Sequence, residues 1–246
     1  MNVHVAMPAF NEAEGIGGFL EELNTELAPW QPAFTVVDDC SSDETSQAVA
    51  DVAALGVAAV ALRNAVNRGH GPSTLRALSA GLDSAAPFII AIDGDGQFAA
   101  SDVRRVLETL IESDSTDIVE GVRVNRNDPW FRKSVSFATQ FLVWSKTREM
   151  PPDANTPLRA YRRDALASVL SRVPGDAMTP NLLISVLSRK GPLTTRQVAV
   201  TALPRRGTSE VGTTWGRGSR LLPSKRFMRF CLDAGRQWFA TTPRQG

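Results

Sequence analysis

The stretch FIIAIDGDGQF, residues 88–98, decides the fold that we expect for this chain. Its first five residues are apolar, which is typical of a strand buried on both faces of a sheet. Asp93 and Asp95 follow at once, with Gly94 between them. Strands of this kind are typical of mostly parallel sheets that helices cover on both faces, so the stretch predicts an α/β fold.

Other apolar runs lie on both sides of this stretch, and segments with helical spacing separate them. The alternation predicts a single α/β domain with a mostly parallel central sheet flanked by helices. Ligands in such folds bind beyond the carboxyl ends of the strands. We expect strands at residues 3–7, 34–37, 57–62, 88–92 and 197–203, and one that begins at 118. We expect helices at 12–27, from a Ser41 cap to 55, from the 67–71 loop to 84, and at 101–111, 130–146, 164–172 and 180–190.

The composition limits the classes of function that this chain can have. The chain has 246 residues, 43% of them hydrophobic, and a formal net charge of +1, so no global charge argument favours nucleic acid. Its two cysteines, Cys40 and Cys231, form neither a disulfide framework nor a zinc motif. We expect no signal peptide, because the first residues lack its basic start and apolar core, and no apolar run approaches the roughly 18 residues of a membrane span. We therefore expect a cytoplasmic protein without a transmembrane segment.

The acidic pair Asp93 and Asp95 is the feature of the sequence that indicates metal-ion chemistry. Carboxylates at i and i+2 after a buried strand present hard oxygen ligands to Mg²⁺ or Mn²⁺, which in turn binds a diphosphate. Gly94 and Gly96 would let the backbone approach a bulky ligand closely. The alternative is an acidic turn, because Asp-Gly is common in turns.

Two further segments fall at predicted strand ends. Asp38 and Asp39 could accept hydrogen bonds from a nucleobase or ribose; the alternative is that Asp39 or Ser41 caps the next helix. The glycine-rich loop 67–71, with Gly69 at its centre, precedes a helix whose backbone amides favour anions. The alternative for this loop is a flexible connection.

Five segments in this order resemble the family-2 glycosyltransferases, in particular the dolichol- and polyprenyl-phosphate sugar transferases. They are VAMPAFNEAEGI (5–16), FTVVDDCSSDET (34–45), NRGHGPSTLRAL (67–78), FIIAIDGDGQF (88–98) and DIVEGVRV (117–124). The resemblance implies a GT-A fold, a UDP- or GDP-linked sugar donor and a divalent cation, Mg²⁺ or Mn²⁺.

The resemblance also assigns residues. It places Asp93 and Asp95 on the metal and diphosphate, and Gln97 beside them. The nucleotide site would be lined by Pro8, Phe10, Glu12, Asp39 and Gly69. An acceptor phosphate would be gripped by Arg123, Arg132, Ser136, Arg159, Arg205 and Arg206. Asp95, Arg123 and Arg132 are the expected catalytic residues.

The sequence departs from the family pattern in several places. Phe10 replaces the usual tyrosine, Cys40 stands where glycine is typical, and Pro157-Leu158 replaces Gly-Phe. The arginine spacing at 205–209 also differs. These departures leave the donor and the acceptor class open.

Three functions follow from these residues. The first is inverting sugar transfer, to a polyprenyl phosphate that needs no general base, or to a protein or glycan hydroxyl that needs one, with Asp153 or Asp176 as candidates. The second is a metal-dependent sugar nucleotidyltransferase, although the first loop lacks its Gly-rich basic signature. The third is a module that binds a nucleotide-sugar without catalysis.

The predicted domain boundaries follow the motifs. Residues 1–210 form the GT-A domain, with a nucleotide-sugar half (1–125) and an acceptor half (126–210). Residues 211–246 form a basic amphipathic segment, in which Phe227, Phe230 and Trp238 share a face. Such a helix lies at a membrane interface or packs on its own domain or a dimer partner.

Overall fold

The computed structural model describes residues 1–124, 130–207 and 225–241. Its centre is a sheet of seven strands in the order β3-β2-β1-β4-β6-β5-β7. The strands are β1 (Val3–Ala9), β2 (Pro32–Asp38), β3 (Ala59–Arg63), β4 (Phe88–Ala91), β5 (Ile118–Val124), β6 (Arg159–Arg162) and β7 (Thr195–Thr201). Only β6 pairs antiparallel to its neighbours β4 and β5. The predicted mostly parallel α/β sheet is confirmed.

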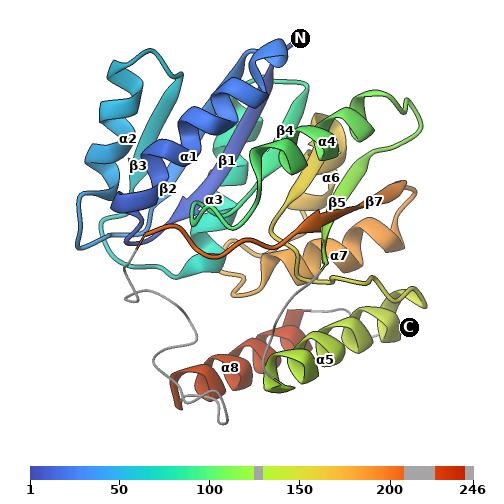
Figure 1. The fold of residues 1–246 in the computed structure, drawn as a ribbon. Coiled ribbons are helices and arrows are strands. Elements are labelled where there is room, and N and C mark those ends of the chain that lie inside the picture. The colour runs from blue at the N-terminus through green and yellow to red at the C-terminus, as the bar shows by residue number, and fades with distance from the viewer. Residues whose placement is uncertain (125–129, 208–224, 242–246) are drawn as a thin grey trace.

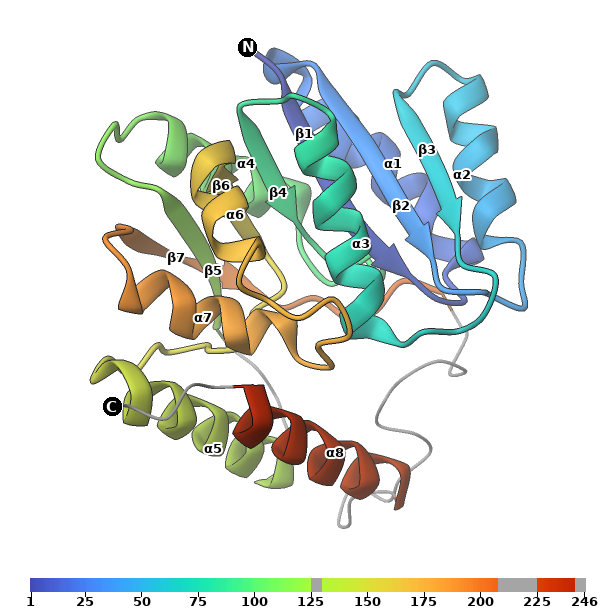
Figure 2. The same cartoon turned by 180° about the vertical axis from the view of Figure 1, so that it is seen from behind.

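Two layers of helices cover the sheet. The helices α1, α2 and α4 lie on the face that Figure 1 presents, and α3, α6 and α7 lie on the face seen in Figure 2. Their bounds are α1 (Ala13–Glu26), α2 (Thr45–Ala54), α3 (His70–Asp83), α4 (Ala100–Ile111), α6 (Arg163–Leu170) and α7 (Pro180–Lys190). Every residue of β1 and of β4 is buried, as expected for strands between two helix layers.

The core has one part on each face of the sheet. On one face Phe19 and Leu23 of α1 and Val106 of α4 pack on the central strands. On the other face Leu78 of α3 and Leu166 of α6 pack on Ile89 and its neighbours. The carboxyl ends of β1, β2 and β4 therefore emerge together at one edge, because these strands are parallel and their register is fixed by burial. We call this edge the acid rim, after its residues Glu12, Asp93 and Asp95.

Helices α5 (Trp130–Thr147) and α8 (Lys225–Thr241) form a third layer beyond the acid-rim edge, where they lie side by side in both views (Figures 1 and 2). Val143 of α5 and Trp238 of α8 are buried in one cluster with Leu75 of α3 and Leu183 of α7. The described end of α8 thus packs on its own domain. Gln237 reinforces the contact by accepting a hydrogen bond from the Met178 amide, with an N–O distance of 2.6 Å.

Candidate active site at the acid rim

The acidic loop after β4 is held by close backbone contacts. The Gly94 amide donates to the Pro8 carbonyl at 3.0 Å, so the loop rests on the end of β1. A Cβ on Gly94 would lie 3.0 Å from Ile16 Cδ1. Gly96 has a positive φ of 67°, and a Cβ there would lie 2.4 Å from Arg206 Cδ. Ile16 and Arg206 thus occupy the space that a side chain at these two positions would need, so packing alone already requires glycine here.

Asp93 and Asp95 lie close enough for their charges to interact. The pKa of Asp95 is raised to about 6, first by burial and then by the Asp93 charge, while the backbone amide of Gln97, which donates to Asp95 Oδ1 at 3.1 Å, acts in the opposite direction. His70 Nε2 lies 3.5 Å from Asp93 Oδ1. Two carboxylates that disfavour each other's ionisation are relieved by a cation.

The donor set fits a hard divalent cation. Carboxylate oxygens are the ligands that Mg²⁺ and Mn²⁺ prefer. Within the described ranges, no group of three or more His, Cys, Asp or Glu side chains gathers as a metal site. A cation at Asp93 and Asp95 would therefore complete its coordination with ligand oxygens and water, as Mg²⁺ commonly does beside phosphates.

Glu12 joins the two aspartates, and Arg205 balances the three acids. Arg205 Nε donates to Glu12 Oε2 at 3.1 Å, and the Glu12 side chain is only 8% exposed. The net pKa of Glu12 is raised to about 7: burial is the largest cause, the ion pair with Arg205 opposes the rise, and the charges of Asp95 and Asp93 contribute to it. The structure thus brings together residues from β1, β4 and the chain after β7.

Asp38 and Asp39 serve the local loops. Asp39 accepts hydrogen bonds from the Arg68 and Gly69 amides, both at 2.8 Å, and from Asn64 Nδ2 at 2.7 Å. It closes the 67–71 loop onto β2 and occupies two amides that we had considered for an anion. Asp38 accepts from Arg63 Nη1 at 2.7 Å. Neither aspartate caps α2.

The predicted Ser41 capping box is also absent. Helix α2 begins at Thr45 without a side-chain cap. The Ser41 hydroxyl instead accepts a hydrogen bond from the Asn11 amide at 3.0 Å. This bond ties the segment after β1 to the segment after β2, so Ser41 shapes the floor of the rim.

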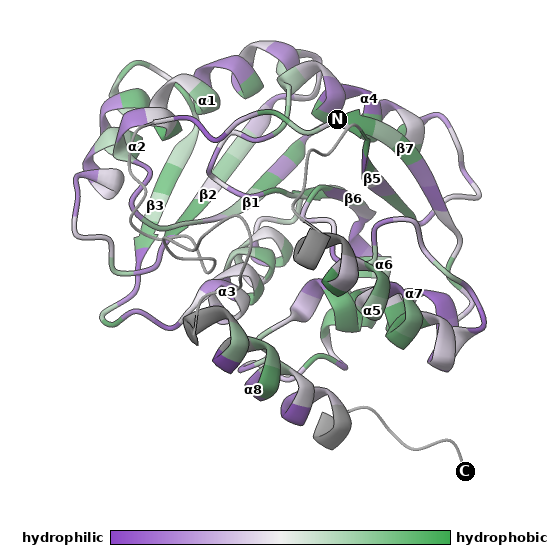
Figure 3. Ribbon diagram, turned by 60° about the horizontal axis from the view of Figure 1, so that its bottom comes forward, coloured by the Kyte–Doolittle hydropathy of each residue, from purple (hydrophilic) through white to green (hydrophobic). Residues whose placement is uncertain are grey.

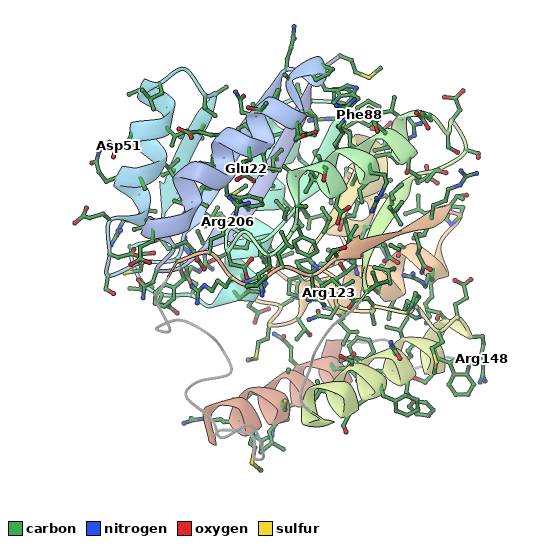
Figure 4. All side chains as sticks on the ribbon, in the orientation of Figure 1. Glu22, Asp51, Phe88, Arg123, Arg148 and Arg206 are labelled. Atoms are coloured by element: carbon green, nitrogen blue, oxygen red, sulfur yellow. The ribbon has the colours of Figure 1, made fainter. Side chains whose placement is uncertain are left out.

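The residues expected to bind the acceptor do not gather at one place in the structure. Arg123, at the end of β5, makes a bidentate pair with Asp153, with Nε–Oδ2 and Nη2–Oδ1 distances of 2.7 and 3.0 Å (Figure 4). Ser136 lies on α5 and its carbonyl accepts from Thr139 Oγ1 at 2.8 Å. The side chain of Arg132 lies outside the described residues.

Arg159 is inside the protein. Its side chain is 0% exposed, its Nη1 donates to the Asn181 carbonyl at 2.9 Å, and its Nη2 lies 3.4 Å from a Glu120 carboxylate oxygen. Arg189 pairs with the same carboxylate. The expectation that Arg159 contacts an acceptor is therefore corrected to a structural position beneath β5 and β6. Nothing in the sequence signals this buried cluster, because Glu120, Arg159 and Arg189 are far apart along the chain.

Arg205 and Arg206, adjacent in sequence, point to different partners. Arg205 faces Glu12 in the acid rim. Arg206 makes two hydrogen bonds to Glu22 on α1, at 2.8 and 2.6 Å, and both side chains lie over the α1 face in Figure 4. The sequence did not predict that these two arginines bind different partners, because nothing in an Arg-Arg pair indicates which of the two side chains faces inward.

Comparison with known proteins agrees with the geometry. A mostly parallel sheet with an acidic loop after β4 is the architecture of GT-A glycosyltransferases, and the solved structures that resemble it belong to that class. One is glucosyl-3-phosphoglycerate synthase from Mycobacterium tuberculosis in complex with Mn²⁺, uridine-diphosphate and glucosyl-3-phosphoglycerate. It matches with a TM-score of 0.66 and 18% sequence identity, over 100% of this chain and 82% of that one.

The family model Glycosyl transferase family 2 matches residues 4–170, and the chain belongs to this family. Undecaprenyl-phosphate 4-deoxy-4-formamido-L-arabinose transferase from Serratia proteamaculans is 30% identical over 69% of this chain and 51% of its own length. The chain thus spans about half the length of this curated relative. The uncharacterized protein MJ1222 from Methanocaldococcus jannaschii is 25% identical over 89% of both chains.

Proposed function

We propose that this glycosyltransferase moves a sugar from a UDP- or GDP-linked donor to a polyprenyl phosphate with inversion at the anomeric carbon. The observation that carries the proposal is the acid rim, where Asp93, Asp95 and Glu12 surround one arginine, Arg205. Among similar proteins, the Serratia relative is named for an undecaprenyl-phosphate acceptor, and the mycobacterial synthase is described with Mn²⁺ and uridine-diphosphate.

The residues of the rim divide the work. Asp93 and Asp95 would hold the divalent cation, which when bound neutralises charge on the leaving diphosphate. Arg205 supplies a second positive charge at the same place, and a guanidinium matches phosphate oxygens in geometry. Pro8, Phe10 and Asp39 would line the nucleotide site, and the backbone amide of Gln97 holds Asp95 by donating to its Oδ1.

The state of Asp153 favours a phosphate acceptor. A hydroxyl acceptor needs a general base, and Asp153 is the nearest described candidate to Arg123. Its two oxygens each accept a hydrogen bond from Arg123, so this carboxylate is engaged with Arg123 rather than directed at an acceptor hydroxyl. A polyprenyl phosphate is already anionic and attacks without this step. Transfer to a protein or glycan hydroxyl is the second candidate.

The test replaces Asp95 with Asn and compares it with Asp51→Asn. Asp51 lies on the outer side of α2, where it accepts from Gln47 Nε2, so its loss spares the rim (Figure 4). We measure nucleoside diphosphate released from UDP- and GDP-sugars with Mn²⁺ and a polyprenyl phosphate. Asp95→Asn should lower the rate by about a hundredfold or more, the size expected for a transition-state charge contact.

Three outcomes would contradict the proposal. Turnover of the Asp95→Asn variant at the wild-type rate would remove Asp95 from the chemistry. Release of pyrophosphate in place of nucleoside diphosphate would identify a nucleotidyltransferase. Tight donor binding without any transfer or hydrolysis would identify a binding module.

We further propose that the layer of α5 and α8 contacts a membrane that carries the acceptor. Both helices turn a buried residue, Val143 or Trp238, toward the domain, so their exposed sides face away from the sheet (Figure 3). Within the described chain, no helix combines the length and hydropathy needed to cross a bilayer. Large apolar side chains are nevertheless exposed on these helices: Phe137 (62%), Phe141 (48%), Met228 (55%) and Leu232 (63%).

Charge on the same layer points to an anionic lipid surface. The side chains of Arg229 and Arg236 on α8 are 87% and 82% exposed, with Asp233 as their shared acidic neighbour. Exposed apolar residues among arginines are the pattern of helices that lie in the headgroup region. We call this surface, made of the four apolar residues and the two arginines, the α5–α8 face.

A further inference from the structure

The chain that leaves β7 returns across the acidic loop as an extended strap, residues 202–207. Ala202 bridges to Phe98, the Leu203 amide donates to the Gln97 carbonyl at 2.9 Å, and the Arg206 amide donates to the Asp95 carbonyl at 3.0 Å. Gln97 Nε2 returns a bond to the Leu203 carbonyl at 3.3 Å. The strap is therefore paired residue by residue with the loop that carries the metal aspartates.

The far end of the strap is fastened to α1 by Arg206. Its guanidinium makes a bidentate pair with Glu22, at 2.8 and 2.6 Å, and lies 5.1 Å from the centre of the Phe19 ring. Its methylene groups cover Gly96, where a Cβ would collide with them. The guanidinium thus points to the outside of α1, away from the acid rim.

Arg205 depends on this attachment for its position. It is the residue before Arg206, and its guanidinium reaches inward to Glu12, at the first turn of the same helix. Two neighbouring arginines thus bind the same helix, one at its N-cap Glu12 and one further along at Glu22. The peptide unit that joins them donates from the Arg206 amide to the Asp95 carbonyl, so both side chains leave the backbone where it rests on the acidic loop.

We infer that Arg206 is a positioning residue, and that its pair with Glu22 holds Arg205 at the acid rim for a donor diphosphate. This replaces the direct acceptor contact that we expected for Arg206 from the sequence. The role of the diphosphate rests on the proposed function, whereas the fastening of the strap does not. The two parts therefore need separate measurements.

The experiment breaks the pair from both sides with Glu22→Gln and Arg206→Gln, and combines them. Glu22 is half exposed on the outer side of α1, so its substitution spares the core. The control is Glu26→Gln on the same helix, whose carboxylate lies 3.8 Å from Arg104. The first readout is amide hydrogen exchange at Leu203 and Arg206, which reports the strap whether or not a nucleotide binds.

Both single variants should raise the exchange rates of these two amides by about two- to fivefold, the range for one well-formed partly exposed pair. The double variant should exchange no faster than either single one, because both substitutions remove the same interaction. Glu26→Gln should exchange as the wild type does. Unchanged exchange in Glu22→Gln would overturn the fastening.

The second readout is the dissociation constant of UDP and of GDP with Mn²⁺. Glu22→Gln and Arg206→Gln should each weaken binding of the nucleotide that the wild type binds by about two- to fivefold, with an unchanged thermal midpoint. The exchanged pair Glu22→Arg with Arg206→Glu should recover most of the loss. A loss in Arg206→Gln alone would mean that Arg206 contacts the ligand directly and would refute the positioning role. If the wild-type protein binds neither nucleotide, the proposed function is refuted, and so is the role of Arg205 toward a donor diphosphate. The exchange rates would still decide whether the Arg206–Glu22 pair holds the strap.

Discussion

His4 is an ionisable side chain inside the sheet, away from the acid rim. It lies in β1, is 6% exposed, and shares a hydrogen bond of 3.0 Å between its Nε2 and Thr35 Oγ1. Burial lowers its pKa below the ordinary value of 6.5. The folded protein therefore holds His4 neutral at a pH where the unfolded chain already binds a proton.

This difference predicts how stability changes with pH. The unfolded state binds more protons than the folded state below pH 6.5, so His4 makes the free energy of unfolding decrease as pH falls from 6.5 toward its lowered pKa. Above 6.5 this contribution is constant. Urea unfolding of the wild type and His4→Asn, measured on both sides of this value, should show a steeper acid loss in the wild type. Parallel pH profiles would contradict the prediction.

At the residue scale, the sequence predicts the acids of the site better than the arginines. Asp93, Asp95 and Glu12 directly follow buried strands or begin the next helix, so topology alone brings them to one edge. The partner of an arginine depends on tertiary distances along a long side chain. This is why Arg159 is buried on Glu120 and Arg206 turns to Glu22, although both resemble acceptor-binding residues.

Helix α3 begins where the chain has almost no room. A Cβ on Gly71 would lie 2.1 Å from the Ala177 carbonyl oxygen and 2.7 Å from that of Met178. Both contacts are to backbone, which cannot give way as a flexible side chain does. The loop before α7 and the first turn of α3 therefore fit only with glycine here.

Gly71→Ala should destabilise the protein by at least about 2 kcal/mol, because the backbone must shift to admit a methyl group. Helix propensity alone would favour alanine by about 1 kcal/mol, so the sign distinguishes packing from propensity. Gly175→Ala is the matched control, since a Cβ there meets nothing within 4 Å. Its effect should stay within about 0.5 kcal/mol in the same urea titration. A stabilising Gly71→Ala would show that the loop moves freely.

At the element scale, the sequence predicts where the helices and strands lie, whereas tertiary contacts determine the residues at which they begin and end. The predicted bounds of α7, 180–190, are confirmed, with Pro180 in its first turn and Gly191 directly after its end. The predicted Ser41 cap is wrong, since α2 begins at Thr45 without a side-chain cap, and α4 begins at Ala100, one residue before its expected start. The antiparallel direction of β6 could not be predicted from the sequence either, because a strand of four residues carries no sign of its direction.

At the scale of the whole molecule, the α5–α8 face gives a prediction about vesicles. The wild type should sediment with anionic vesicles of phosphatidylglycerol and much less with phosphatidylcholine, since arginines and apolar side chains act together. A Phe137→Ser and Leu232→Ser variant should bind at least about tenfold more weakly, because burying each such side chain contributes about 1.5–3 kcal/mol. Co-sedimentation measures both.

The control for that experiment is Leu55→Ser. Leu55 ends α2 and is 76% exposed, so it matches the loss of an exposed apolar side chain at a place outside the α5–α8 face. Equal loss in this variant would point to unspecific adsorption. If the wild type stays in the supernatant with anionic vesicles, the proposal that the α5–α8 face contacts a membrane is refuted.

The overall architecture follows from the sequence more fully than the arrangement of α5 and α8 does. Alternating strands and helices predict the central sheet. The sequence leaves two positions open for the amphipathic C-terminal segment, and burial of Trp238 against Leu75 and Val143 shows packing on the domain for its described end. Residues 211–224 of that predicted segment lie outside the described residues.

The strap also bears on how the protein is made. Translation delivers Glu12, Asp93 and Asp95 early, whereas Arg205, their counter-charge, leaves the ribosome only after β7. A nascent chain that has folded its first four strands carries an acidic edge with mutual repulsion and no guanidinium to offset it. Completion of this centre is thus a late, long-range event in biosynthesis, and chains that terminate before the strap should accumulate as incompletely assembled forms open to proteolysis.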